Sequence, residues 1–486
     1  MTQRANPPIK KPRGETVRQQ VYLELRRAIE QGTFTPGTRL PASREQATTL
    51  GVSRNSVLWA LERLQSEGYV VARVGDGSYV ADNLGALVSS AAATQGLRPP
   101  VAAGLSQRGQ LMADTVSRWN PSLQAAHPFR IGAPEIATFP FAVWDRLARQ
   151  ASKEQRMAQA QYLDPAGSPA LRDAIAQWLW VSRGIRCEAA QLVVCSGSQQ
   201  GIDLVGRLLL DVGDEAWVED PGYLGIRSSL EGHGVTVRPV AVDNEGLVVD
   251  QAAAQWPAAR LAVVTPTSQF PTGVRMSLQR RLALLDWANT QQAWIVEDDY
   301  DGEFQYGTHR LPALCSLPHA QRVLYVGTFS KSLHPGLRLG FIVLPHALAG
   351  AFAMARALTD RHAPGDTQDV LARFITEGHL LRHLRRMREL YPQRQQVLID
   401  AVAKASQGQL VLQPSEQGMH LLHELPAGQD DLVLSARAQQ AGLLLAPLSR
   451  YTIASQRRGW LFGYAGYDTA ALRKAAHVLG KLLRNQ

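Results

Sequence analysis

Five short apolar runs between residues 192 and 326 each lead into polar side chains that could do chemistry. In chain order, these are the turn Ser196-Gly197-Ser198, Tyr223, the polar turn 266–273, the acidic run 297–299 with Tyr300, and Thr328, Ser330 and Lys331 with Arg338 behind them. A Gly/Ser turn that opens a helix offers N–H groups and hydroxyls to a phosphate. A tyrosine on a turn can stack on a flat ring, and a lysine can form a Schiff base with an aldehyde.

The acidic run Glu297-Asp298-Asp299 needs a positive partner, because three adjacent carboxylates repel one another. A metal ion is one such partner, but no histidine lies near enough in the sequence to strengthen that interpretation, and we predict no metal site. The run follows residues 294–296, which predict a strand. Successive strand residues point to opposite faces, so Asp298 and Tyr300 should share one face and Asp299 should lie on the other.

The elements that must position these groups belong to an α/β domain. Over residues 128–486, apolar strands alternate with amphipathic helices, which predicts a mostly parallel central sheet in a large part at about 160–365 and a smaller C-terminal α/β subdomain at about 366–486. Such sheets bind ligands at the carboxyl ends of their strands, where each polar group lies. Together the groups fit pyridoxal 5′-phosphate, with Lys331 on its aldehyde, an aspartate on its ring nitrogen, and Ser196, Ser198, Thr328, Ser330 and Arg338 on its phosphate.

Residues 15–82 have the element order of a winged helix. The pattern predicts helices over 17–31, from Ser43 to Leu50 with Ser43 and Gln46 as a capping box, and from Ser53 to Glu67 with Val57, Leu58, Leu61 and Leu64 facing inward. Two strands, 70–74 and 78–80, join at a Gly75-Asp76-Gly77 turn. A small helical bundle with ordinary surface arginines and serines is the alternative.

In a winged helix, the third helix would enter the major groove of DNA. Its first turn would present Ser53, Arg54, Asn55 and Ser56 to base edges or phosphates. Arg44 and Arg73 would flank the helix, and Gly77 would let the hairpin approach the minor groove. Residues 1–82 carry 12 Lys and Arg against 8 Asp and Glu, which suits a nucleic-acid partner.

The remaining sequence limits the class of protein. The 486 residues, with 45% hydrophobic and 19% charged residues, suit a globular chain of several domains and exclude a disordered or collagen-like one. Residues 1–14 are expected to be a solvated tail or a basic arm, and residues 83–127, rich in Ala, Gly, Ser, Gln and Pro, a linker. Cys187, Cys195 and Cys315 lie far apart, which fits a reducing cytoplasm. No secretory signal or apolar span long enough for a membrane is visible.

The motifs resemble known families at both ends of the chain. Leu-Pro-Ala-Ser-Arg at 40–44, the segments 50–57 and 64–69, and Arg-Val-Gly-Asp-Gly-Ser-Tyr-Val at 73–80 resemble the DNA-binding domain of GntR-type bacterial regulators. Tyr162, Gly167, Leu171-Arg172, Pro-Thr-Gly at 271–273, Glu-Asp-Asp-Tyr at 297–300, Ser330-Lys331 and Arg-Leu-Gly at 338–340 resemble fold-type I aminotransferases over roughly 128–486. The stretch 297–304 is typical of the MocR/GabR regulators, which fuse such a head to such a body.

This resemblance implies a role for each matching residue. Lys331 corresponds to the Schiff-base lysine, Asp298 to the partner of the ring nitrogen, Tyr300 to the partner of the ring hydroxyl and Tyr223 to the stacking ring. Ser196, Gly197, Ser198, Thr328, Ser330 and Arg338 correspond to the phosphate site. Ser268 stands where many relatives have histidine, so contacts from that turn differ. Arg450 is the candidate for an effector carboxylate, with Arg457 and Arg458 close by.

Two functions follow from the resemblance. The first is a transcriptional regulator that binds operator DNA and pyridoxal 5′-phosphate and senses an amino compound or the vitamer itself, acting as a homodimer. The second is a working aminotransferase with a fused DNA-binding head, because both the lysine and the acid are present. Turnover separates them, since an enzyme must also move a proton and release product. The complete winged helix favours the regulator.

Overall fold

The computed structural model describes residues 16–73, 75–84, 104–117, 127–307, 311–426 and 428–484. The chain divides into two compact units, one up to Gly104 and the other from Leu105 onward, which we call the head and the body. The expected tail 1–14, Val74 and most of the expected linker lie outside the described residues.

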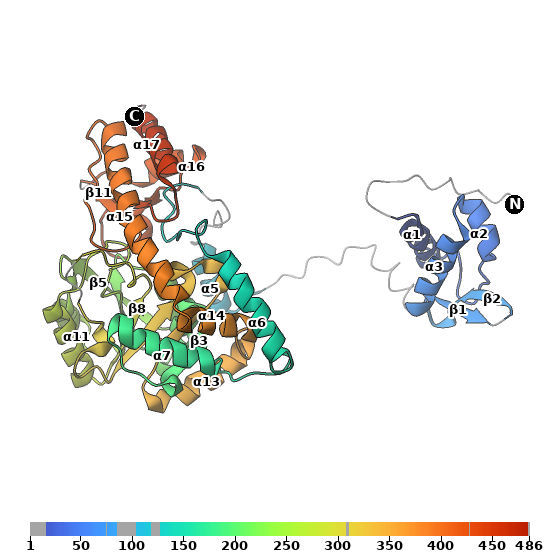
Figure 1. Cartoon of the computed structure of the whole chain (residues 1–486), viewed down its shortest axis with the longest axis horizontal. Coiled ribbons are helices and arrows are strands. Elements are labelled where there is room, and N and C mark those ends of the chain that lie inside the picture. The colour runs from blue at the N-terminus through green and yellow to red at the C-terminus, as the bar shows by residue number, and fades with distance from the viewer. Residues whose placement is uncertain are drawn as a thin grey trace. The chain divides into compact units, whose positions relative to one another are not determined.

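The head is a winged helix (Figure 1). Its three helices are α1 (Val17–Glu30), α2 (Ser43–Leu50) and α3 (Arg54–Ser66), and its wing pairs β1 (Val70–Arg73) with β2 (Gly77–Val80) in antiparallel register. Their apolar faces meet in one core, in which Val21, Val57, Ala60 and Leu64 are fully buried. Burial of these side chains fixes the orientation of α3, so that the polar face of this helix is exposed to solvent.

Two details of the head differ from the sequence-based expectation. Leu58 was expected inside but is 36% exposed, because the core of α3 is filled by Val57, Leu61 and Leu64. Ser43 does not cap α2: it is the first helical residue, behind Ala42, and the side chain of Gln46 donates to the carbonyl of Pro41 instead.

The segment 83–127 was expected to be a linker, and that prediction is wrong for part of it. Helix α5 (Gln107–Ser117) belongs to the body and packs on α9 (Leu224–Gly232). Arg108 Nε donates to the carbonyl of Gly232 at 2.6 Å. The apolar side chains of α5 are few and largely exposed, so its sequence pattern is weak.

An eight-stranded sheet forms the centre of the body, with the order β3-β10-β9-β8-β7-β4-β5-β6. Its strands are β3 (Leu192–Cys195), β4 (Glu215–Asp220), β5 (Thr236–Asp243), β6 (Gly246–Leu247), β7 (Leu261–Val264), β8 (Trp294–Asp299), β9 (Val323–Thr328) and β10 (Gly340–Val343). Strands β9, β8, β7, β4 and β5 are parallel, and β10 is antiparallel to both β9 and β3, so β3 runs with the parallel set. The predicted mostly parallel sheet is therefore confirmed.

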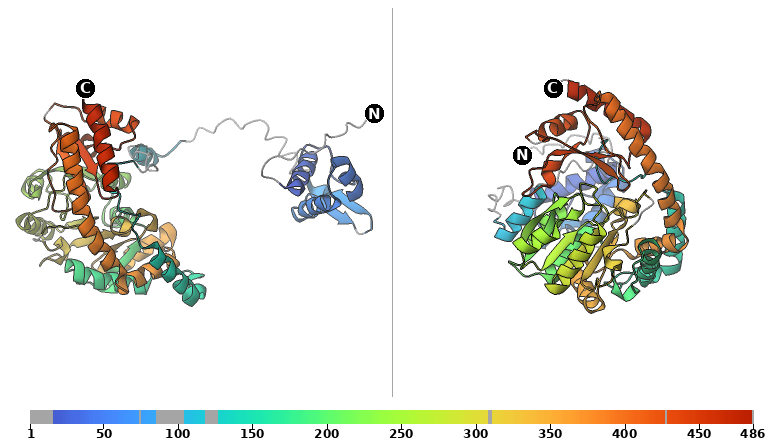
Figure 2. Two further views of the ribbon diagram at one scale, coloured as in Figure 1. Left: turned by 45° about the horizontal axis from the view of Figure 1, so that its top comes forward. Right: turned by 90° about the vertical axis from the view of Figure 1, so that its left-hand side faces the viewer.

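Helices cover both faces of this sheet (Figure 2). On one face lie α8 (Ser198–Leu209), α9 and α13 (His346–Asp360), and on the other lie α7 (Pro169–Arg183), α10 (Val249–Gln255), α11 (Leu278–Thr290) and α14 (Gly365–Thr376). Within β8, Val296 packs on the first face and Ile295 on the second. This alternation decides where the acidic residues that follow them point.

The C-terminal subdomain is a smaller α/β layer. Strands β11 (His420–Glu424), β13 (Gly459–Gly463) and β12 (Ala446–Pro447) form an antiparallel sheet, accompanied by α16 (Leu432–Gln440) and α17 (Thr469–Arg484). The long helix α15 (His379–Ala405) packs on α14 and on α17 and so joins the two parts of the body. In the described part of the chain, we find no helix with both the length and the apolar content of a membrane span.

Candidate functional site

A cavity of about 510 Å³ lies at the carboxyl ends of strands β3, β4, β7, β8 and β9. Of the predicted cofactor and effector residues, those that line it are Gly197, Ser198, Tyr223, Asp298, Tyr300, Thr328, Ser330, Lys331, Arg338 and Arg450. The fold brings these side chains together from strand ends that are far apart in the sequence, as an open α/β sheet does.

Lys331 points into this cavity from α12 (Phe329–Ser332), the short helix that follows β9. Its Nζ donates to the carbonyl of Gly132 at 2.8 Å. A Cβ atom at residue 132, where φ is +67°, would lie 2.6 Å from Nζ, so a side chain there would displace the amine from this position. Burial lowers the pKa of Lys331, an effect that the nearby Asp301 opposes. A larger fraction of the amine is therefore neutral and nucleophilic than for an exposed lysine.

Asp298 lies on the cavity face of β8 and has one carboxylate oxygen to spare. The side chain is 3% exposed, and its Oδ1 is buried without a hydrogen-bond partner among the described residues. Burial, followed by the charges of Asp299 and Glu219, raises the pKa of Asp298 to about 7. A buried carboxylate without a partner is costly unless a donor or a cation arrives. A protonated ring nitrogen would supply both, so the residues present fit a pyridinium cofactor.

Asp299 points to the opposite face of β8, as the strand alternation predicts. Its Oδ2 pairs with Arg183 at 2.6 Å and accepts from the Tyr325 hydroxyl at 2.5 Å. Arg183 comes from the end of α7, and both side chains of the pair are at most 5% exposed. The carboxylates that would repel one another are thus divided between a cavity face and a buried ion pair.

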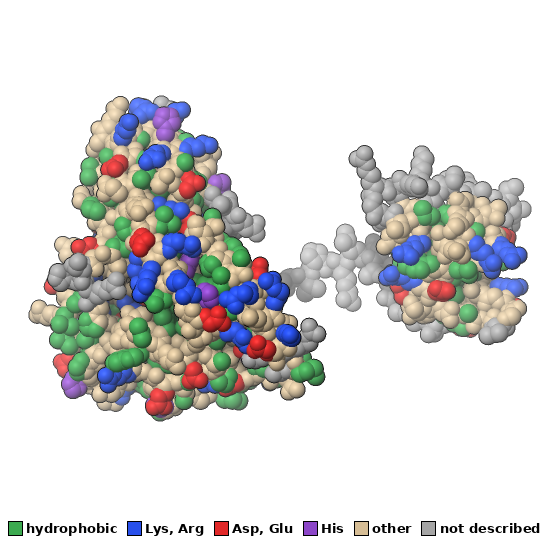
Figure 3. All heavy atoms as spheres, in the orientation of Figure 1, with side chains coloured by type: hydrophobic (Ala, Val, Ile, Leu, Met, Phe, Trp, Pro, Cys, Tyr) green, Lys and Arg blue, Asp and Glu red, His purple; other side chains and the backbone are tan. Residues whose placement is uncertain are grey.

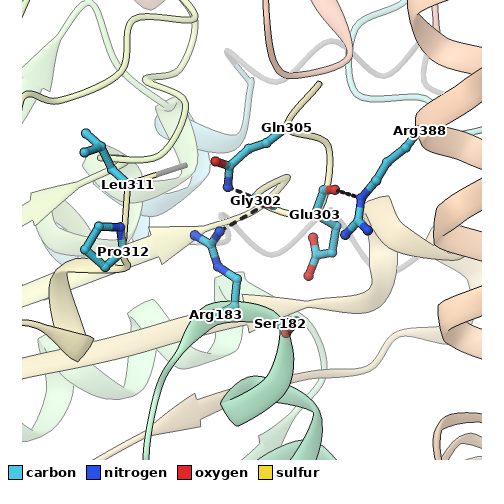
Figure 4. Close-up of a pocket in the computed structure, with 8 residues that line it drawn as sticks. All are labelled: Ser182, Arg183, Gly302, Glu303, Gln305, Leu311, Pro312 and Arg388. Carbon is cyan, nitrogen blue, oxygen red and sulfur yellow. Dashed lines mark hydrogen bonds between the residues drawn. The ribbon is translucent and has the colours of Figure 1, made fainter. Parts of the chain in front are cut away.

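Arg183 of this ion pair also lines a second, polar cavity, of about 220 Å³ (Figure 4). Arg183 donates to the carbonyl of Gly302, and Arg388 of α15 donates to the carbonyl of Glu303 at 2.6 Å. Burial and the nearby Asp299 raise the pKa of Glu303 to about 7. The loop after β8 is therefore fixed from the side away from the cofactor cavity.

Among the described residues, no group of three or more His, Cys, Asp and Glu side chains is arranged to hold a metal ion.

The raised pKa of Asp298 predicts a pH dependence for the cofactor-free chain. A group whose pKa is higher in the folded than in the unfolded state stabilises the fold below its unfolded pKa and loses that effect as the pH rises through its folded pKa. We expect the cofactor-free chain to melt at a lower temperature at about pH 8 than at about pH 5, and Asp298→Asn to narrow that difference. Thermal unfolding followed by circular dichroism measures the two melting temperatures. If their difference were the same in Asp298→Asn as in the wild-type chain, the raised pKa would not belong to Asp298.

The residues that were expected to hold a phosphate lie around the start of α8. Gly197 precedes the helix with φ +98°, Ser198 is its first residue, and both line the cavity. Arg338 donates to the carbonyl of Ser196 at 2.6 Å, and Thr328 Oγ1 accepts from the N–H of Ser330 at 3.2 Å. Ser196 itself is not among the described lining residues. The free N–H groups of the helix start and a guanidinium therefore face the cavity together.

Several lining residues were missed by the sequence analysis. These are Ile131, Gly132, Gln199, Leu224, Thr265, Phe270, Pro335, Met419, His420 and Tyr451. Phe270 meets the rings of Tyr223, Tyr300, His420 and Tyr451 at centroid distances of 5.2–5.9 Å. Its place directly before the Pro-Thr-Gly turn was the available signal. The contributions of residues 131–132 and 419–420 arise only when the subdomain folds back on the sheet.

Arg450 lines the rim of the cavity and is exposed. Its two rivals are placed differently. Arg457 pairs with Glu424 at 2.6 Å, and Arg458 donates to the carbonyl of Arg457, and neither is among the described lining residues. The carboxylate of Asp220 at the end of β4 accepts from three N–H groups of residues 453–455, which anchors the loop that carries Arg450. Ser268 is buried but likewise does not line the cavity.

In the head, the predicted first turn of the recognition helix is exposed. Ser53 caps α3 by accepting from the N–H of Ser56 at 3.2 Å, as expected. Arg54, Asn55 and the flanking Arg44 and Arg73 are exposed. Arginine side chains, drawn in blue, lie on both sides of the visible face of the head (Figure 3).

Arg39, an arginine that the sequence analysis missed, lies against the wing. A Cβ atom at residue 77, where φ is +123°, would lie 3.3 Å from Arg39 Nε. Arg39 also pairs with Asp76 at 3.6 Å. The absence of a side chain at Gly77 therefore accommodates Arg39 over the wing turn, which places a further cation where the hairpin would approach DNA.

Comparisons with known proteins agree with this geometry. Residues 132–479 match the family described as aminotransferase class I and II, and residues 17–80 match the bacterial regulatory proteins of the gntR family. The chain is 38% identical over 462 residues to the probable rhizopine catabolism regulatory protein MocR of Rhizobium meliloti, covering 95% of this chain and 92% of that protein. It is 32% identical to the transcriptional regulator TauR of Rhodobacter capsulatus, with 94% of both chains covered.

Solved structures resemble the body. The α-aminoadipate aminotransferase LysN of Thermus thermophilus, solved with N-(5′-phosphopyridoxyl)-L-leucine, has a TM-score of 0.68 and 26% identity, and the match covers 76% of this chain and 97% of that one. An archaeal alanine:glyoxylate aminotransferase, at 24% identity and a TM-score of 0.70, shares the fold. The matches to these solved structures do not include the head, whereas the matches to the regulators cover both the head and the body.

Proposed function

This chain belongs to the MocR subfamily of GntR-type transcriptional regulators with an aminotransferase-like body. We propose that it binds pyridoxal 5′-phosphate around Lys331 and that its affinity for operator DNA depends on what occupies that site. The observation that carries the proposal is that Lys331 and Asp298 both line one cavity. A lysine of lowered pKa and a buried carboxylate oxygen without a partner are the two groups that a phosphorylated pyridine aldehyde needs.

The roles of the residues follow from their positions. When bound, pyridoxal 5′-phosphate supplies an aldehyde carbon that exchanges one amine for another and a ring that withdraws electrons. Lys331, now hydrogen-bonded to Gly132, would supply the amine for that carbon, and Asp298 would accept from the ring nitrogen. The phosphate would be held by the N–H groups at 197–198, the hydroxyls of Thr328 and Ser330, and Arg338. Tyr300 would bond the ring hydroxyl, and Tyr223 would stack on the ring.

The effector in this proposal is an amino compound, or the vitamer itself. The amine of the effector would take the place of the Lys331 amine, and a carboxylate on the same molecule would pair with Arg450 at the rim. The body acts as a sensor rather than as an enzyme, and the protein works as a homodimer in the cytoplasm, where its operator lies. The support is that relatives named as regulators match more than nine-tenths of the chain.

A turnover measurement tests the sensor against the aminotransferase. We expect amines to shift the absorption spectrum of the loaded protein once, with no sustained formation of a keto product when an amino donor and a keto acceptor are both in excess. Arg450→Gln should weaken the response to amino acids about tenfold and leave the response to the same amines without a carboxylate unchanged. Continued product formation by the wild-type chain would establish the enzyme instead.

The DNA-binding role of the head, which the gntR-family match supports, can be tested at Arg54. Its Nε lies 3.3 Å from Ser43 Oγ, so the guanidinium is held beside the exposed first turn of α3. We expect Arg54→Ala to cost about 1–3 kcal/mol at the operator and to relax the preference at one base pair. Binding titrations against the operator and scrambled DNA at two salt concentrations measure this effect.

A matched control comes from the same helix. Arg63→Ala, at the far end of α3, removes an arginine that is paired with Glu67 at 3.1 Å and should leave the sequence preference unchanged. If Arg54→Ala kept the wild-type affinity and salt dependence on both DNAs, α3 would not be the recognition helix.

A further inference from the structure

The N–H, the carbonyl and the hydroxyl of Ser196 each form a hydrogen bond with another residue. Its N–H donates to Gln200 Oε1 at 2.8 Å, and its carbonyl accepts from Arg338 at 2.6 Å. Its hydroxyl donates to Asp360 Oδ2 at 3.4 Å. This hydroxyl is thus bonded to α13, and Ser196 is not among the described residues that line the cavity with Ser198 and Arg338.

Asp360, the last residue of α13, is where these contacts converge. Its Oδ2 also accepts from Gln200 Nε2 at 3.2 Å, so one carboxylate holds both Ser196 and Gln200. Its Oδ1 lies 3.6 Å from the NH2 atom of Arg356, whose side chain is 0% exposed. Arg356 donates in turn to the carbonyl of Pro165 at 3.2 Å. A guanidinium that is fully buried requires a compensating charge, and Asp360 supplies it from one side of α13.

We propose that Asp360, held by Arg356, is a positioning residue that shapes the turn 196–198 for the phosphate of the cofactor. The inference rests on the proposed binding of pyridoxal 5′-phosphate. The carboxylate fixes Ser196 and Gln200, and Ser196 in turn fixes Arg338 through its carbonyl. The N–H groups at the start of α8 and the guanidinium then face the cavity before any ligand arrives. Donors that are oriented in advance bind a phosphate more tightly, because no reorganisation is needed.

The consequence is selective for the phosphate. The network touches neither Lys331 nor Asp298, which hold the aldehyde and ring ends of the ligand in the proposed function. Loss of Asp360 should therefore weaken the binding of pyridoxal 5′-phosphate but not that of pyridoxal, which has the same ring and aldehyde and no phosphate. A merely structural role would weaken both ligands alike.

The experiment titrates the cofactor-free full-length chain with each vitamer and follows the absorbance. Asp360→Asn keeps the shape of the side chain and an oxygen for Arg356, but presents a donor to Ser196 and Gln200. We expect its Kd for pyridoxal 5′-phosphate to rise about tenfold while its Kd for pyridoxal stays within about twofold of wild type. The control is Asp203→Asn on α8, a carboxylate of similar exposure that pairs with His233 and Arg207. It should change neither Kd.

A second variant guards against a folding defect. Gln200→Ala should show the same selective loss, and the double variant should lose less than the product of the two single effects, because both residues act through one network. Equal losses for both vitamers, or no loss for the phosphorylated one, would overturn the inference while leaving the proposed function intact. If the wild-type chain bound neither vitamer, the proposed function would fall, and this inference with it.

Discussion

Lys331→Ala, purified in the presence of pyridoxal 5′-phosphate, should lack the visible absorption band of the wild-type protein. The Nζ of Lys331 is the amine that lies in the cavity with Asp298, and alanine leaves no amine there to bond the aldehyde. The effect should be a complete loss rather than a partial one. Absorption spectra of the two proteins after removal of free cofactor measure it, with circular dichroism to show that the fold is kept.

A matched control for this loss is available on α15. Lys404→Ala removes an exposed lysine in the last turn of that helix and should retain the full band. An unchanged band in Lys331→Ala would place the cofactor on another residue and would remove the basis for the site described above.

Asp298→Asn and Asp299→Asn, one residue apart, should fail in different ways. Asp298→Asn removes the charge that faces the cavity and should weaken retention of pyridoxal 5′-phosphate by more than about tenfold, while the chain still folds. Asp299→Asn breaks the buried pair with Arg183 and should lower the free energy of unfolding by about 3–5 kcal/mol.

Two measurements separate these outcomes. Cofactor titrations give the affinity of each variant, and urea unfolding of the cofactor-free proteins gives the stability. Suppose that both substitutions lowered the affinity for the cofactor equally and changed the free energy of unfolding by the same amount. The alternation along β8 would then not continue to the end of the strand, and the assignment of Asp298 to the ring nitrogen would be wrong.

The sequence was sufficient for those parts of the site that depend on local regularity. Alternation along β8 predicted the opposite directions of Asp298 and Asp299, and the positions of the polar groups at strand ends predicted that they would meet. The cap at Ser53 and the hairpin at 75–77 were likewise readable, because turns and caps are encoded within a few residues.

Contacts between distant segments could not be read in this way. The carbonyl of Gly132 meets Lys331 although the two residues are 199 positions apart, and Arg183 reaches Asp299 of β8 from helix α7. Ser196 was expected to touch the phosphate, but its hydroxyl faces Asp360, a residue that no local pattern singles out. Helix α5 was missed because its apolar residues are too sparse to stand out from a linker.

The most direct test of the account is operator binding by the loaded and the cofactor-free protein, with and without candidate amines, for the wild-type chain and Lys331→Ala. We predict that cofactor and amine change the operator affinity of the wild-type chain, and that Lys331→Ala binds the operator with the same affinity under all these conditions. A wild-type chain whose operator affinity is the same whether the site is loaded, cofactor-free or exposed to amines would contradict the claim that the body regulates the head.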